Sequence, residues 1–129
     1  MRVLFVGGWY DVFVGGAAEG FQLARQAGLD AELLLGPWSH NLWQRQLNGV
    51  DCGPSAEFSF QQEVIDFLSR NEPGPRLRYF TMGDCRWHEA SQWPPADATP
   101  ATLAVTVDES SQALHFPTHP VPAAGGHSC

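Results

Sequence analysis

The chain has 129 residues, of which 43% are hydrophobic, and it carries a formal net charge of −7. This length suits one domain with its own core, and the apolar content excludes a disordered chain. The acidic balance, without lysine or a run of basic residues, argues against nucleic acid as a partner. No apolar stretch is long enough to span a membrane, and Met1 leads into a strand-like run rather than an export signal. We therefore expect no membrane partner and favour the cytoplasm.

The first forty residues predict one β-α-β unit. Residues 2–6 (RVLFV) form an apolar run that stops at a glycine pair, which is typical of a buried parallel strand. Residues 16–28 place apolar side chains at three- and four-residue intervals, and Gly28 stands where a glycine ends a helix. Residues 31–35 (AELLL) predict a second strand. We expect the two strands to be adjacent and parallel, joined by the helix.

The next segment predicts a loop and then a second helix. Residues 41–58 lack a clear period and contain Asn-Gly and Gly-Pro pairs, which favour turns. Ser59 heads a capping box with Gln62, and the helix is expected to continue to about Arg70. Its apolar face is predicted from three side chains, Val64, Phe67 and Leu68.

The pattern changes after Pro75. Apolar and polar residues alternate at 77–81 and again at 103–107, which predicts antiparallel, half-exposed strands. The proline-rich stretch between them predicts a linker that lies over a surface, and the last thirteen residues are expected to be extended.

Asp11 and His40 follow the two predicted strands of the β-α-β unit. In open parallel sheets, functional side chains gather just past the carboxyl ends of the strands. Neighbouring strands lie about 4.8 Å apart, so a carboxylate and an imidazole at their ends can reach one another. In α/β-hydrolases the triad runs serine, acid, histidine, and a single helix-containing connection between Asp11 and His40 fits the last two. The alternative is that Asp11 caps a turn and His40 lies in a loop.

Three segments resemble one family. GGWYDVFVGGA and LLLGPWSH are similar to the acid and histidine motifs of α/β-hydrolases of the cocaine esterase and X-Pro dipeptidyl-peptidase type. RYFTMGDCRWHEASQWPP resembles that family's entry into a C-terminal β-sandwich, and HPVPAAGGHSC resembles an extended segment inside it.

The resemblance implies an α/β fold. Residues 1–73 would be the C-terminal β-α-β part of the hydrolase sheet, and residues 74–129 would begin an antiparallel, jelly-roll-like β-sandwich. It also implies a serine hydrolase acting on small esters or peptide-like amides, with Asp11 as triad acid, His40 as general base, and neither cofactor nor metal.

The nucleophile of that family is missing from this sequence. A nucleophile elbow reads Gly-x-Ser-x-Gly, and no serine of the chain has this flanking pattern. We expect a fragment or one piece of a split gene, whose partner is the missing N-terminal part of the hydrolase and which is inactive alone. The competing hypothesis is a non-catalytic β-sandwich module that presents Trp87 and Trp93 to a glycan or a partner.

Other candidate residues are weaker. His88, His115, His119 and His127 lack the helical pairing and the neighbouring cysteines that a zinc site needs. Three widely spaced cysteines match neither a disulfide framework nor a metal site, which favours reduced thiols. Cys52 has no evident base nearby, so it is a poor nucleophile. Trp87 and Trp93 are expected to anchor the linker.

Overall fold

The computed structural model describes residues 1–42, 44–47, 49–72, 77–102, 106–108 and 113–115. The described residues fall into two compact units, one that ends at residue 96 and one that begins at residue 97. In the described part, no helix is long and apolar enough to cross a membrane.

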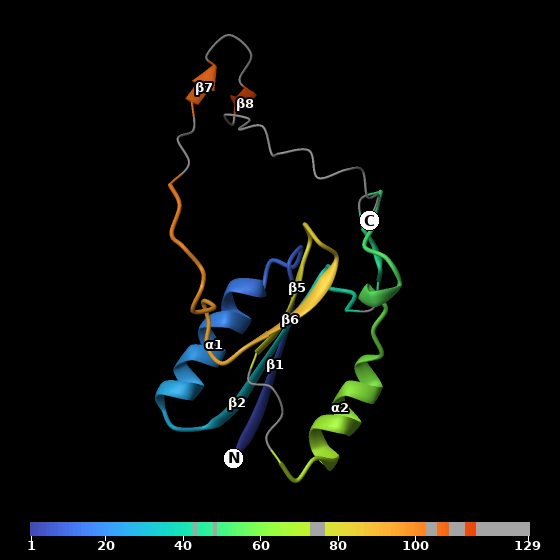
Figure 1. Cartoon of the computed structure of the whole chain (residues 1–129), viewed down its shortest axis with the longest axis vertical. Coiled ribbons are helices and arrows are strands. Elements are labelled where there is room, and N and C mark those ends of the chain that lie inside the picture. Colours follow the sequence, from blue (N-terminus) through green and yellow to red (C-terminus); the bar gives the residue numbers. More distant parts are fainter. Residues whose placement is uncertain (43, 48, 73–76, 103–105, 109–112, 116–129) are drawn as a thin grey trace. The chain divides into compact units, whose positions relative to one another are not determined.

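A four-stranded mixed sheet is the centre of the first unit, with strand order β1-β2-β5-β6 (Figure 1). β1 (Arg2–Gly8) pairs in parallel with β2 (Asp30–Gly36). α1 (Val14–Gln26) connects them, so the predicted β-α-β unit is confirmed. The helix begins two residues earlier than expected, and Gly28 ends it with a φ of +74°, the left-handed conformation that glycine adopts readily.

Alternation along β2 sends successive side chains to opposite faces of the sheet. Ala31, Leu33 and Leu35 are buried in a core cluster with Phe21 and Ala24 of α1. This face of the sheet is therefore covered by α1. Glu32, which lies between these residues in sequence, must point to the other face.

α2 (Phe60–Ser69) follows the predicted cap, since the Ser59 hydroxyl accepts a hydrogen bond from the Gln62 N–H at 3.3 Å. Its apolar face differs from the prediction. Phe67 is buried, whereas Leu68 is 71% exposed. A glutamate, Glu63, takes a buried place on this helix, so part of the helix is held by charge rather than by apolar packing.

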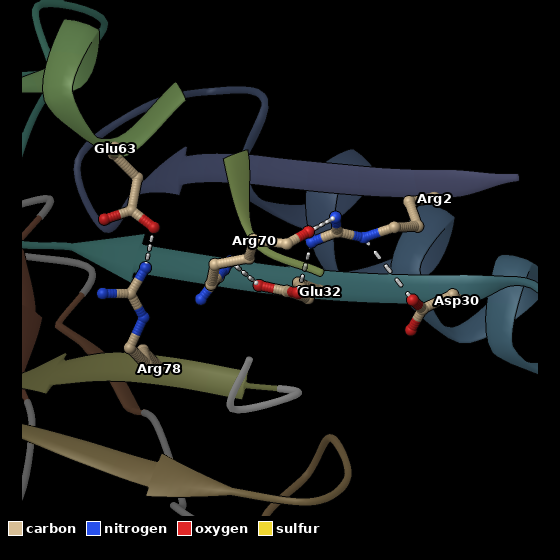
Figure 2. A network of polar contacts seen from close by, with 6 residues as sticks. All are labelled: Arg2, Asp30, Glu32, Glu63, Arg70 and Arg78. Atoms are coloured by element: carbon tan, nitrogen blue, oxygen red, sulfur yellow. Dashed lines mark hydrogen bonds and ion pairs between the residues drawn. The ribbon is translucent and has the colours of Figure 1, made fainter. Parts of the chain in front are cut away.

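An ion network lies on the sheet face opposite the α1 core (Figure 2). The Glu32 carboxylate is 2% exposed and accepts a hydrogen bond from the Arg70 guanidinium at 2.7 Å. Arg2 pairs with both Glu32 and Asp30, and it donates to the main-chain oxygen of Arg70 at 2.8 Å. A buried carboxylate is tolerated only when it is paired, so these contacts explain why Glu32 can occupy a core position. The network also contains an ion pair between Glu63 of α2 and Arg78.

The sheet is completed by two strands beyond the second helix. β5 (Leu77–Thr81) pairs with β2 in parallel, and β6 (Arg86–Ala90) pairs with β5 antiparallel. The strand at 77–81 was expected, but as part of a separate antiparallel structure. It extends the central sheet instead, because β2 offers it a free edge. β6 falls in a stretch where no strand was predicted.

Three shorter elements lie in the segment where only a loop was predicted. These are a small hairpin of β3 (Gln46–Leu47) with β4 (Val50–Asp51), and the 3-10 helix η1 (Pro54–Ala56). In the second unit, β7 (Thr106–Asp108) pairs antiparallel with β8 (Ala113–His115). The expectation for the last thirteen residues lies outside the described residues, as do His119 and His127.

Gly8 ends β1 where there is no room for a side chain. A Cβ there would lie 2.1 Å from the Trp38 carbonyl oxygen, whereas a Cβ at Gly16 on α1 would meet nothing within 4 Å in the described chain. We expect Gly8→Ala to lower the free energy of unfolding by about 2–3 kcal/mol through backbone overlap. Gly16→Ala should raise it by about 0.5–1 kcal/mol through helix propensity. The free energy of unfolding of both variants can be measured in urea. An equal change in the two variants would show that the backbone contact at Gly8 is not tight.

Candidate active site

The turns after β1 and β2 lie side by side. The register pairs Gly8 with Gly36, so the two strands end at the same level of the sheet. Asp11 is three residues past the first end and His40 is four residues past the second. Parallel pairing thus brings the two predicted site residues to one edge of the sheet, as strand-end positions do in open α/β sheets.

Main-chain hydrogen bonds continue between the two turns beyond the strands. The Trp9 N–H donates to the Gly36 oxygen at 2.9 Å, and the Tyr10 N–H donates to the Trp38 oxygen at 3.0 Å. The Asp11 N–H donates a hydrogen bond to the Gly8 oxygen at 2.9 Å, which closes a turn within the same segment. The backbone that carries Asp11 is therefore tied directly to the backbone that carries His40.

The two side chains are hydrogen-bonded. His40 Nδ1 lies 3.0 Å from Asp11 Oδ2. An ionised carboxylate can only accept, so Nδ1 carries the hydrogen and donates it. The Asp11 side chain is 8% exposed and that of His40 is 79% exposed. Within the described part of the chain Nε2 has no hydrogen-bond partner, so this nitrogen is available to accept a proton.

The second oxygen of Asp11 has a separate partner. Oδ1 accepts a hydrogen bond from the Phe13 N–H at 3.1 Å. This bond first, and the hydrogen bond from His40 next, lower the pKa of the Asp11 carboxyl. Both bonds favour the carboxylate, so Asp11 stabilises the fold above its ordinary pKa and loses this effect only as the pH falls through the lowered value. Asp11 therefore caps a turn and holds His40 at the same time.

One aromatic side chain lies beside the exposed imidazole. The Phe13 ring lies 5.6 Å from the His40 ring between centroids and is tilted by 59°. Tyr10, Val12 and Phe13 are all exposed. Sequence reasoning did not single out Phe13. Its position two residues after the acid, where an N–H meets the carboxylate of such a turn, is the signal that could have found it.

The arrangement can take up a proton but holds no nucleophile. A histidine with Nδ1 bonded to a carboxylate and Nε2 free can act as a general base, because the carboxylate stabilises the imidazolium. Among the described residues, no serine hydroxyl is hydrogen-bonded to Nε2. Ser39, beside His40 in sequence, is occupied by the Asn41 N–H, which approaches its Oγ to 3.5 Å.

The tryptophans of the competing hypothesis pack against the chain itself. The Trp87 indole donates to the Ser55 oxygen at 2.8 Å, and its ring contacts Phe80. The Trp93 ring packs against Trp9 at 5.9 Å, and its main-chain oxygen accepts a bond from Gln22. These contacts agree with the anchoring role expected for both residues.

Among the residues whose side chains are described, the remaining candidates do not come together in one site. His88 Nε2 lies 2.9 Å from Asp84 Oδ2 on the β5-β6 hairpin, and no group of three or more ligating side chains that could hold a metal occurs in the described residues. Cys52 is a buried free thiol whose pKa is raised by burial first and by the Asp51 carboxylate next, which disfavours the thiolate. Cys85 is disulfide-bonded, so the expectation of reduced thiols is wrong for this residue.

Comparisons with known proteins give sequence relatives that are esterases by name. Cocaine esterase of Rhodococcus sp. is 31% identical over 95% of this chain and 27% of its own length. Two proteins of Mycobacterium bovis and Mycobacterium tuberculosis, provisionally named as serine esterases, are 30% identical over 71% of this chain and 16% of their own. The chain therefore spans about a quarter of cocaine esterase and a smaller share of the mycobacterial relatives.

Solved structures also align with the chain. The crystal structure of an aminopeptidase from the marine sediment archaeon Thaumarchaeota archaeon aligns with 88% of this chain and 20% of its own, at 21% identity and a TM-score of 0.49. No protein family profile matches the chain. Cocaine esterase matches nearly all of the chain at 31% identity, and the chain therefore belongs to the cocaine esterase family that its motifs indicate.

Proposed function

We propose that this chain supplies the acid and the base of a serine hydrolase of the acyl esterase or X-Pro dipeptidyl-peptidase type. The observation that carries the proposal is the 3.0 Å contact between Asp11 and His40, just past the carboxyl ends of two paired parallel strands. Asp11 is the triad acid and His40 the general base. The nucleophilic serine belongs to a part of the protein outside these 129 residues.

Each residue has a defined task in acyl transfer. His40 Nε2 takes the proton of the serine hydroxyl while the serine oxygen attacks the substrate carbonyl, and the imidazolium then gives that proton to the leaving alcohol or amine. Asp11 keeps the hydrogen on Nδ1 and stabilises the imidazolium. Water, activated by His40 in the same way, releases the acid product from the acyl-enzyme and restores the serine. Donors for the oxyanion come from the serine-bearing part.

The relatives support an ester substrate. All three sequence relatives carry an esterase name. The Asp-His geometry serves amides equally well, since the same triad cleaves both bonds. The acyl and leaving groups are selected by segments outside this chain, with the exposed rim of Tyr10, Val12 and Phe13 contributing one side of the site.

We further propose that the residues after the central sheet begin a β-sandwich. The antiparallel pairing of β7 with β8, and the separate compact unit that begins at residue 97, support this assignment. The boundary proposed from the family resemblance is residue 74. The pairing of β5 and β6 with the central sheet favours a later start for the sandwich.

Reconstitution tests the proposal. The isolated chain should hydrolyse a short-chain aryl ester no faster than buffer, because it has neither a nucleophile nor an oxyanion hole. Joined to the serine-bearing portion of its own protein, it should restore turnover and a burst of acyl-enzyme. The serine-bearing portion alone is the control and should be inactive. Turnover by the isolated chain, or full turnover by the control, would show that the active site is not divided in this way.

A further inference from the structure

A buried tryptophan, Trp38, contacts the Asp11 turn from within the His40 turn, and the proposed mechanism does not use it. Trp38 follows β2, precedes His40 by two residues, and is 0% exposed. A fully buried tryptophan in a turn is a strong anchor, because its ring removes a large area from water and its N–H must find a partner.

The ring fixes the His40 turn to the segment that contains η1. The Trp38 indole N–H donates to the Ala56 oxygen at 3.2 Å, and the ring packs against Phe58 with centroids 4.6 Å apart. It also covers Gly36, where a Cβ would come within 2.3 Å of the ring. The ring can therefore occupy this place only because residue 36 is glycine.

The main chain of Trp38 holds the Asp11 turn. Its carbonyl oxygen accepts the hydrogen bond from the Tyr10 N–H at 3.0 Å, and it lies so close to Gly8 that a Cβ there would be 2.1 Å away. One residue thus joins the two turns that carry the acid and the base.

The support under Trp38 is itself tied to the central sheet. Trp87 of β6 contacts the Trp38 ring, with centroids 5.6 Å apart, and donates to the Ser55 oxygen at 2.8 Å. Ser55 Oγ donates to the Cys85 oxygen of the same hairpin at 3.0 Å. The η1 segment is therefore held between the β5-β6 hairpin and the Trp38 ring.

His40 needs such a support because little else restrains it. Its side chain is 79% exposed, and its described contacts are the hydrogen bond to Asp11 and the Phe13 ring. The place of Nε2 is therefore determined mainly by the backbone of the turn. A displacement of about 1 Å at a reacting group can reduce the rate about 100-fold.

We propose that Trp38 is a positioning residue of the hydrolase, which sets His40 Nε2 and the Asp11 carboxylate at reacting distance by anchoring one turn and bonding the other. The proposal rests on the proposed function, since it assigns a role within that active site.

The test uses the complete, serine-bearing enzyme. Trp38→Phe keeps a ring beside Phe58 and loses the bond to Ala56, whereas Trp38→Leu loses both. We expect kcat for an aryl ester to fall about 10-fold in the first and about 100-fold in the second, with KM changed less than about twofold. Phe67→Leu is the matched control, because Phe67 is buried on α2 and its ring packs against Arg2 at the start of β1 rather than within either turn. It should change thermal stability and leave kcat unchanged.

A second measurement is independent of turnover. The ¹⁵N and ¹H shifts of the His40 ring report the hydrogen that Nδ1 donates to Asp11, and this signal should weaken in both Trp38 variants but not in Phe67→Leu. Circular dichroism identifies the temperature at which every variant is folded. A folded Trp38→Phe with unchanged kcat and an unchanged Nδ1 signal overturns the proposal. If His40→Ala in the parent enzyme keeps its turnover, the proposed function fails instead, so the two failures are distinguishable.

Discussion

His40→Ala should reduce kcat of the complete hydrolase on the order of 10⁴- to 10⁶-fold, the range found when a triad histidine is removed. The reason is the geometry at the strand ends. Nε2 is the free nitrogen of an imidazole whose Nδ1 is bonded to Asp11, and no other base lies beside it in the described residues. Without this base, a serine keeps its proton and remains a weak nucleophile at neutral pH.

The chain supplies a matched control for this experiment. His88 also faces a carboxylate, with 2.9 Å between its Nε2 and Asp84 Oδ2, and it lies on the β5-β6 hairpin rather than beside Asp11. His88→Ala removes an Asp-His pair of similar length and should leave kcat within about twofold. Initial rates on an aryl ester measure both variants. Near-normal turnover by His40→Ala, or an equal loss in both, would show that the base is misassigned.

Asp11→Asn should reduce kcat by roughly 10⁴-fold while the fold remains intact. The amide can present its NH₂ group to Nδ1, which makes Nδ1 the acceptor and places the hydrogen on Nε2. The imidazole is then in the tautomer that cannot take a proton from serine. The loss of the negative charge also removes the stabilisation of the imidazolium.

The turn around Asp11 makes this substitution a clean test. An asparagine oxygen can still accept the Phe13 N–H, so the cap of the turn survives while the charge is lost. Thermal unfolding should therefore change little, and the pH dependence of kcat/KM should change greatly. Asp84→Asn is the parallel control and should keep its activity. A kcat for Asp11→Asn within tenfold of the parent would exclude Asp11 as the triad acid.

Local patterns explain which elements could be predicted. Residues 2–6 and 31–35 are short, mainly apolar runs that stop at glycines, which favours strands. The strand at 31–35 is buried as expected, whereas residues 2–6 are only half-buried because β1 lies at the edge of the sheet. Ser59 accepts from the N–H three residues on because the N-cap is a property of one helical turn. Asp11 and His40 were found because parallel strands place their carboxyl ends at one edge of the sheet.

Other elements could not be predicted from the sequence, because they depend on pairing between strands that are distant in the chain. β6 reads RWHEA, a sequence without strict apolar alternation, and it becomes a strand because β5 offers it hydrogen-bonding groups. β5 itself joins β2 in parallel, and neither sequence pattern nor spacing reveals which free edge a strand will use. Glu32 is a charged residue within an apolar run, so the sequence pattern does not explain how it can be buried. Its carboxylate is paired with Arg2 and Arg70, which are distant in the sequence.

The sequence by itself determined the β-α-β unit, the cap of the second helix and the two residues of the candidate site, because each depends on neighbours within a few positions or on one topological rule. Only the tertiary structure decided how firmly that site is held. The Trp38 contacts to Tyr10 and Ala56 join segments far apart in the chain, and such contacts follow from the packing of the whole sheet rather than from any local preference.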